Sequence, residues 1–351
     1  MFLRWFCRSC IVLHSSLLAM ALAAGIASAA VGDSFKGDAQ KIDDITVTPL
    51  SIDAKTLLPC LFWDGDKGDA FIAMDANGVI RRISYPDFKV LQEKDLQRKA
   101  AWLCPSAEGL VMTVPDKQEV WLLDAFTFDV KSKIDAPGVE RAVSAPTSSV
   151  AAGSAKNKVG ISGGNLLCID LKQGKTTSFE RADFGAGPVG FLNPAMTPDG
   201  KYVLTQGGYC ICRFQVADGK FKYEESSSGT FTGAPRIGVE VSPDSKWCCL
   251  PSGGAYVTLV YSVTSLAKPE CSLEQGPHPI AVGFDPAGGW ICTHTPGHVL
   301  ALFTPSGVKK KEYAFDKKGH DVFQYLAHPD GNKLLLLQSD KLYAVELPKQ
   351  P

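Results

Sequence analysis

Short apolar runs, interrupted by one kind of tight turn, repeat along most of this chain. An apolar segment precedes the turn Thr197-Pro198-Asp199-Gly200, and a second apolar segment, Tyr202–Leu204, follows it. Proline presets φ at the first central position of such a turn, aspartate bonds nearby backbone, and glycine accepts positive φ. The pattern predicts two antiparallel strands joined by a hairpin.

The turn recurs at a nearly constant distance. Its prolines are separated by 41, 52, 45, 43 and 43 residues; they are Pro105, Pro146, Pro198, Pro243, Pro286 and Pro329. A third apolar strand follows each hairpin, as in Leu166–Asp170, and a more polar fourth strand follows that. Four strands in about 43 residues match one blade of a β-propeller. No long stretch after residue 30 has helical periodicity, which argues against alternating strands and helices.

Seven such units can be placed, at 57–96, 100–138, 139–180, 189–227, 236–276, 279–316 and 322–348. The last unit lacks one strand, which residues 45–50 can supply by pairing with the strand near 341–347; a closed ring leaves no exposed edge. We therefore predict an all-β fold, with a single propeller of seven four-stranded blades spanning 45–348. Six or eight blades stay open as alternatives, because the first three units are degenerate.

Three segments carry a family resemblance. They are Gly276-Pro277-His278-Pro279-Ile280-Ala281-Val282-Gly283-Phe284-Asp285-Pro286, Trp121–Thr127 and Leu259–Thr264. These segments resemble the repeats of YVTN-type propellers, a class similar to WD40 proteins, although no Trp-Asp pair recurs at the ends of the repeats. The resemblance covers most of the chain. It implies a scaffold that binds a ligand or a protein, and it transfers no catalytic residue.

The first 29 residues have the features of a secretory signal peptide. Arg4 and Arg8 form a basic start, Ile11–Ala27 is mainly apolar, and Ala27-Ser28-Ala29 fits the small-residue cleavage rule. An uncleaved membrane anchor is the alternative, because the apolar stretch approaches spanning length. We expect cleavage near Ala29, a periplasmic or secreted protein, and a flexible segment at 30–44 before the propeller.

Charge narrows the range of partners. The chain has 36 basic and 37 acidic residues, so removal of Arg4 and Arg8 leaves 34 against 37, a net charge of −3. This balance argues against a nucleic-acid partner or a charged membrane surface. No segment after the signal is long and apolar enough to span a bilayer. We expect a monomer without a cofactor, whose partner is a protein or a small anionic ligand.

Nine cysteines follow the signal: Cys60, Cys104, Cys168, Cys210, Cys212, Cys248, Cys249, Cys271 and Cys292. Cys249 and Cys292 occupy equivalent second-strand positions, as small core residues would, and we expect mainly structural thiols. The alternative is a disulfide joining Cys210 or Cys212 to Cys248. Neither the cysteine spacing, nor Asp64–Asp69, nor the pair His294 and His298 matches a metal site.

One set of basic residues recurs five to nine positions before the turn prolines: Arg98, Arg141, Arg236, His278 and His320. In propellers of this kind the connection into the innermost strand faces the ligand, so these residues predict a basic rim for a carboxylate, phosphate or sulfate group. The alternative is pairing with Glu140, Asp321 and neighbouring acids. We expect an exported, non-catalytic binding scaffold. The alternative function is a quinoprotein-like or lyase-like enzyme, which needs a convergent acid, base or metal set in the central funnel.

Overall fold

The computed structural model describes residues 37–53, 55–156, 164–180, 183, 191–207, 210–227, 238–250, 257–274, 281–286, 288–289, 291–295, 299–314, 322–338 and 341–348. The predicted signal peptide lies outside this range. Regular structure in the described part is β-strand, apart from short 3-10 turns at η1 (Pro115–Lys117) and at Asp183. No helix there has the length and apolar composition needed to cross a membrane.

The strands form six four-stranded antiparallel sheets and one five-stranded sheet, and we name each sheet after its innermost strand. The first three sheets comprise β3 (Phe62–Trp63), β4 (Ala70–Met74), β5 (Val79–Ser84), β6 (Val90–Asp95); β7 (Trp102–Ser106), β8 (Gly109–Val114), β9 (Glu119–Leu123), β10 (Val130–Asp135); β11 (Val139–Val143), β12 (Val150–Ala155), β13 (Asn165–Asp170) and β14 (Lys175–Glu180).

The next three comprise β15 (Leu192–Met196), β16 (Tyr202–Gly207), β17 (Cys210–Ala217), β18 (Lys220–Ser226); β19 (Glu240–Val241), β20 (Trp247–Cys249), β21 (Val257–Ser262), β22 (Cys271–Glu274); β23 (Ala281–Phe284), β24 (Ile291–Thr295), β25 (Val299–Phe303) and β26 (Lys309–Ala314). The five-stranded β27 sheet comprises β27 (Val322–Ala327), β28 (Lys333–Gln338), β29 (Leu342–Glu346), β2 (Ile45–Leu50) and β1 (Gln40–Ile42).

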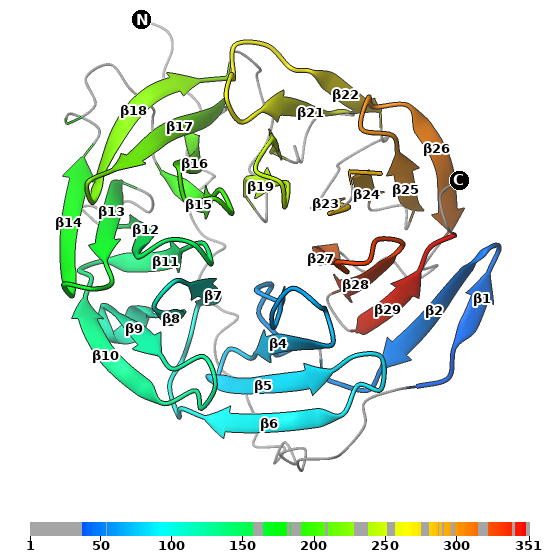
Figure 1. Ribbon diagram of the computed structural model, residues 1–351, viewed down its shortest axis with the longest axis horizontal. Coiled ribbons are helices and arrows are strands. Elements are labelled where there is room, and N and C mark those ends of the chain that lie inside the picture. The colour runs from blue at the N-terminus through cyan, green and yellow to red at the C-terminus, as the bar shows by residue number, and fades with distance from the viewer. Residues whose placement is uncertain are drawn as a thin grey trace, which may run out of the picture. The chain divides into compact units, whose positions relative to one another are not determined.

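The sheets are arranged as a β-propeller. Figure 1 shows β7, β11, β15, β19, β23 and β27 nearest the centre, with β6, β10, β14, β18 and β26 at the outside. Each four-stranded sheet lies within one unit predicted from the sequence. The all-β propeller fold is therefore confirmed.

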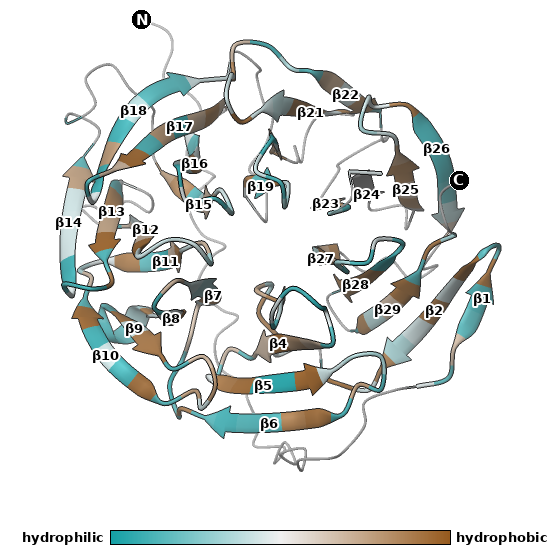
Figure 2. Cartoon of the chain, viewed as in Figure 1, coloured by the Kyte–Doolittle hydropathy of each residue, from teal (hydrophilic) through white to brown (hydrophobic). Residues whose placement is uncertain are grey.

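The core lies between the sheets. Hydrophobic clusters fill the space between each pair of sheets that follow one another in the chain, for example between the β7 and β11 sheets around Val111 and Leu167. A further cluster packs Leu335 and Leu337 of β28 against Phe71 and Ile83 of the β3 sheet. Second and third strands are mostly buried, whereas fourth strands such as β10 and β14 are mostly exposed. Figure 2 shows the same contrast in hydropathy, with hydrophilic residues frequent along the outer strands.

The repeated turn has the predicted chemistry. Gly200 has φ +72° and donates its N–H to the Thr197 carbonyl at 2.8 Å. The buried Thr197 hydroxyl lies 2.6 Å from the Asp199 carboxylate and accepts the Tyr202 N–H at 3.0 Å. Ser242 forms the same bonds in the next unit, with Asp244 and Trp247. The side chain of the first turn residue therefore bonds both the turn aspartate and the backbone N–H at the start of the second strand.

The N-terminal boundary differs from the prediction. Residues 30–44 were expected to precede the propeller, yet β1 pairs with β2 in the register Gln40↔Val47 to Ile42↔Ile45. The reason is a tight hairpin at Asp43, which has φ +53°. The ion pair between Asp44 and Lys311, 2.7 Å long, joins this hairpin to β26.

Candidate anion site at the inner strands

Arg141 lies on the innermost strand β11, opposite Ser154 of β12. Its guanidinium carbon is 3.4 Å from the centre of the Trp102 ring, which belongs to the first residue of β7. An arginine over an indole face makes a favourable cation–π contact. The Trp102 ring thus holds the guanidinium between two neighbouring inner strands.

Glu240 supplies the opposite charge. It is the first residue of β19 and is half-buried. Burial raises its pKa to about 7, and the positive charge of Arg141 partly opposes that rise. Burial also lowers the pKa of Arg141 to about 10, so the guanidinium stays protonated at neutral pH. Arg141 and Glu240 lie on inner strands separated by the β15 sheet, and each charge affects the pKa of the other residue.

Two thiols lie in the same electrostatic environment but are chemically quiet. Burial raises the pKa of Cys60 and that of Cys104 to about 12, so both stay neutral. The Cys104 sulfur accepts the backbone N–H of Ser144 at 3.1 Å. Glu240, whose pKa is about 7, can exchange a proton at neutral pH. The two buried thiols, by contrast, are not activated nucleophiles.

The five predicted site residues have different outcomes. Arg141 was placed on the connection before an inner strand, and the structure instead puts it on that strand, where a register shift separates Val139 from Arg141. Arg98 does lie on such a connection, between β6 and β7; it is exposed and donates to the Gln97 carbonyl at 3.2 Å. The other three, Arg236, His278 and His320, lie outside the described residues, so their convergence stays a prediction.

The turn and charge patterns of the sequence do not single out Trp102 and Glu240. Both lie three residues before a turn proline, at equivalent positions of their units. An alignment of the units on the turn prolines puts them in a column with Ala195 and Leu326, on inner strands. The signal available in the sequence was the charge of Glu240, in a column that otherwise holds apolar residues such as Ala195 and Leu326.

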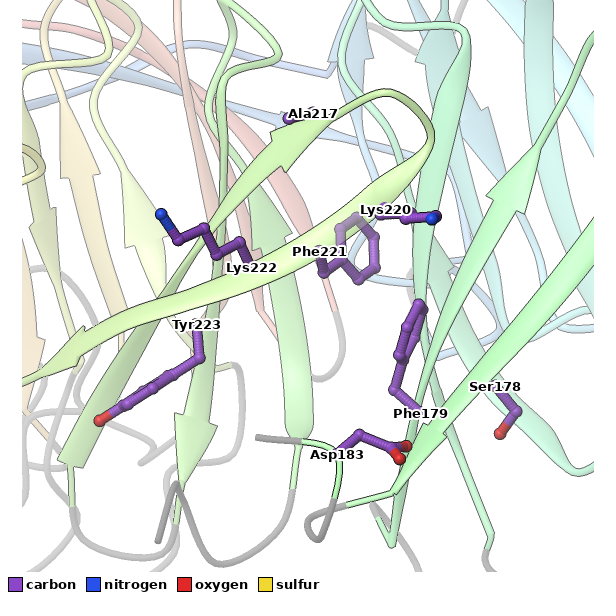
Figure 3. Close-up of a pocket in the computed structure, with 8 residues that line it drawn as sticks. All are labelled: Ser178, Phe179, Asp183, Ala217, Lys220, Phe221, Lys222 and Tyr223. Atoms are coloured by element: carbon purple, nitrogen blue, oxygen red, sulfur yellow. The ribbon is translucent and has the colours of Figure 1, made fainter. Parts of the chain in front are cut away.

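A hollow lies at the outside of the propeller. It has a volume of about 660 Å³ and is lined by Ser178, Phe179, Asp183, Ala217, Lys220, Phe221, Lys222 and Tyr223. Figure 3 shows the rings of Phe179 and Phe221 beside each other, and their centres are 6.1 Å apart. Its lysines come from the outer strand β18, and Asp183 already accepts the Glu180 N–H at 2.6 Å. None of the predicted site residues lines this hollow.

The cysteines are unbonded wherever the structure describes their side chains. Cys249 is fully buried on β20, as predicted, and the backbone of Cys292 lies on the equivalent strand β24, opposite Gly283. The alternative bridge between Cys210 or Cys212 and Cys248 is wrong. Cys212 packs between the β11 and β15 sheets, whereas Cys248 packs between the β15 and β19 sheets.

In the described part of the chain, no group of three or more His, Cys, Asp or Glu side chains is placed to hold a metal ion. Asp64, in the connection between β3 and β4, accepts a hydrogen bond from Arg82 at 2.5 Å. The side chains of His294 and His298 lie outside the described residues.

No protein-family model matches the chain, and no curated protein matches it in sequence.

Proposed function

We propose that this protein is an exported, non-catalytic propeller that binds an anionic group at the inner strands around Arg141. The observation that carries the proposal is a protonated guanidinium held against the indole of Trp102, on the innermost strand of its sheet. Arginine is well suited to carboxylate, phosphate and sulfate groups because its donors form a rigid fork. The low polarity around buried groups strengthens such a contact relative to one at the surface.

The neighbouring groups make the proposed affinity depend on pH. At alkaline pH the ionised Glu240 offsets the charge of Arg141. Below about pH 7 Glu240 is neutral, and Cys60 and Cys104 are neutral throughout. Anion binding should therefore strengthen as pH falls. His278 and His320 act in the same direction if they converge on this face, because only protonated imidazole attracts an anion.

We also propose that the propeller is of the YVTN type, and that the β27 sheet is its seventh blade, closed by β2. Support comes from the antiparallel pairing of β2 with β29, Thr46↔Glu346 to Leu50↔Leu342. Hydrogen bonds between the β27 sheet and the β3 sheet also support the proposal. Trp63 donates its indole N–H to the Ala327 carbonyl at 2.6 Å. The side-chain amide of Gln324 accepts a hydrogen bond from the Leu61 N–H and donates one to the Leu61 carbonyl, both at 2.8 Å.

Export rests on the sequence of residues 1–29. Expression of the full chain, followed by mass measurement of the mature protein, tests it directly. A mature N-terminus at Ala30 is expected. An N-terminus at Met1 in purified protein would leave the anchor as the better interpretation.

Sulfate titration by isothermal calorimetry tests the binding site. We use sulfate because it stays a dianion across neutral pH. The wild type should bind sulfate at pH 6, and Arg141→Gln should lose at least about tenfold in affinity, as removal of one charge-assisted contact implies.

The double variant Lys220→Gln/Lys222→Gln is the matched control, because it removes charge from the outer hollow alone. Its sulfate affinity should equal that of the wild type. Unchanged affinity in Arg141→Gln, or loss of affinity in the lysine variant, would place the anion elsewhere.

A further inference from the structure

Two cysteines share one face at the start of β17. Cys210 and Cys212 are two residues apart on a strand, so both side chains project to the same side. Their sulfur atoms are 3.6 Å apart. The described cysteines are all unbonded. The two thiols of this pair differ in exposure.

Cys210 is half-buried and its sulfur lies 3.0 Å from the Gly207 carbonyl, whereas Cys212 is fully buried. The bond from the Cys212 thiol, with a smaller contribution from the Ser226 side chain, lowers the pKa of Cys210 to about 7. The same bond and burial raise the pKa of Cys212. An accessible thiol with thiolate character and a protonated thiol behind it are the two parts of a nucleophile and a resolving group.

We propose that Cys210 and Cys212 form a redox-active dithiol that reacts with disulfides, with Cys210 as the nucleophile and Cys212 as the resolving thiol. The partner is defined by its chemistry: a disulfide, whether of a small thiol or of a protein. Nothing in the anion-binding proposal requires this reaction, and the two sites lie on different strands.

The reaction balances in two steps. The Cys210 thiolate attacks one sulfur of the disulfide, a mixed disulfide forms, and the first thiolate leaves and takes up a proton. The Cys212 thiol then loses its proton, and its sulfur attacks the Cys210 sulfur, which releases the second thiolate. The protein dithiol loses two electrons, and the partner disulfide gains them as two thiols.

Geometry favours a labile bond over a structural one. Cα atoms two residues apart on a strand are roughly 6.6 Å apart, near the upper end of the range for disulfides. The sulfurs must also approach from 3.6 Å to about 2.0 Å. Cys210 is the first residue of β17; it pairs with Gly207 of β16, whereas the register with β18 begins only at Cys212 and shifts between Arg213 and Phe214. A strained and accessible disulfide exchanges readily.

The test uses the intact mature protein and oxidised glutathione. After incubation, free thiols are alkylated without reduction and peptides are analysed by mass spectrometry; trypsin places both cysteines in residues 202–213. We expect this peptide to be lighter by two hydrogen atoms and unalkylated. Cys271 is the internal control: it is half-buried as well, but burial raises its pKa, so it should remain alkylated.

Two variants separate the roles of the thiols. Cys212→Ser should retain glutathione on Cys210, whereas Cys210→Ser should take up none at Cys212. Two free thiols in the oxidised wild type, or glutathione uptake at Cys271 equal to that at Cys210, would overturn the proposal. The wild-type result stands even if a variant fails to fold. Failure here leaves sulfate binding untouched, so the two proposals are tested separately.

Discussion

Arg141 and Glu240 show how single residues acquire unusual properties from their position on inner strands. Glu240 has an ordinary pKa of 4.5 in an unfolded chain, and burial raises it to about 7 in the folded protein. The folded state therefore binds more protons than the unfolded state between these two pH values. By linkage, this residue contributes stability that is present below about pH 4.5 and is lost as pH rises through about 7.

We predict that Glu240→Gln removes this pH dependence. The free energy of unfolding of the variant, relative to that of the wild type, should increase by about 1–3 kcal/mol between pH 4.5 and pH 8, since one pKa unit corresponds to about 1.4 kcal/mol. Urea denaturation at several pH values measures it. Parallel stability curves for the two proteins would show that Glu240 is not desolvated in the folded state.

Of the three residues of the candidate site, the sequence pattern predicted Arg141 alone. Arg141 stood out because basic residues recur before the turn prolines, yet its place on β11 depends on a register shift that the spacing does not encode. Trp102 and Glu240 carry no motif. Their importance arises only when the ring brings three inner strands around one centre, which is a tertiary property.

At the level of elements, the turns contact one another as well as closing their own hairpins. Thr147 donates its hydroxyl to the Pro198 carbonyl at 2.7 Å, and Ser245 accepts the Asp199 N–H at 3.1 Å. His328 lies 3.0 Å from the Gly68 carbonyl through its Nε2 atom. The turn sequences predicted the local hairpins, because proline, aspartate and glycine act within four residues. They did not predict these contacts, which depend on the neighbouring sheet.

Gly68 gives a sharp test of the contact between the β27 and β3 sheets. Gly68 and Gly65 both have positive φ, +68° and +89°, so alanine is strained at either position. A Cβ at Gly68 would lie 2.5 Å from Nε2 of His328, whereas a Cβ at Gly65 would meet nothing within 4 Å. The difference between the two variants isolates the contact with His328 and the adjacent Pro329.

We predict that Gly68→Ala lowers the free energy of unfolding by at least about 2 kcal/mol more than Gly65→Ala does, as expected for a forced shift of packed groups. Thermal and urea denaturation of both variants measures the difference. Equal stabilities would mean that the two sheets do not meet at His328, and would count against a closed ring.

For the whole molecule, the period of about 43 residues was enough to predict the propeller, because each four-stranded unit must bury its faces against neighbours. Residues 40–42 were missed since β1 is short and mostly exposed, with no apolar alternation to mark it. Its position is fixed by the hairpin to β2 and by the ion pair of Asp44 with Lys311.

The proposed binding site is a property of the same ring, because Trp102, Arg141 and Glu240 come from three different sheets. The most direct test is the pH dependence of sulfate affinity, measured by calorimetry at constant ionic strength for the wild type, Glu240→Gln and Arg141→Gln. We predict that wild-type affinity falls as pH rises through about 7, that Glu240→Gln retains more of its affinity at pH 8, and that Arg141→Gln binds weakly at every pH. Sulfate binding that is equally strong in Arg141→Gln would contradict it.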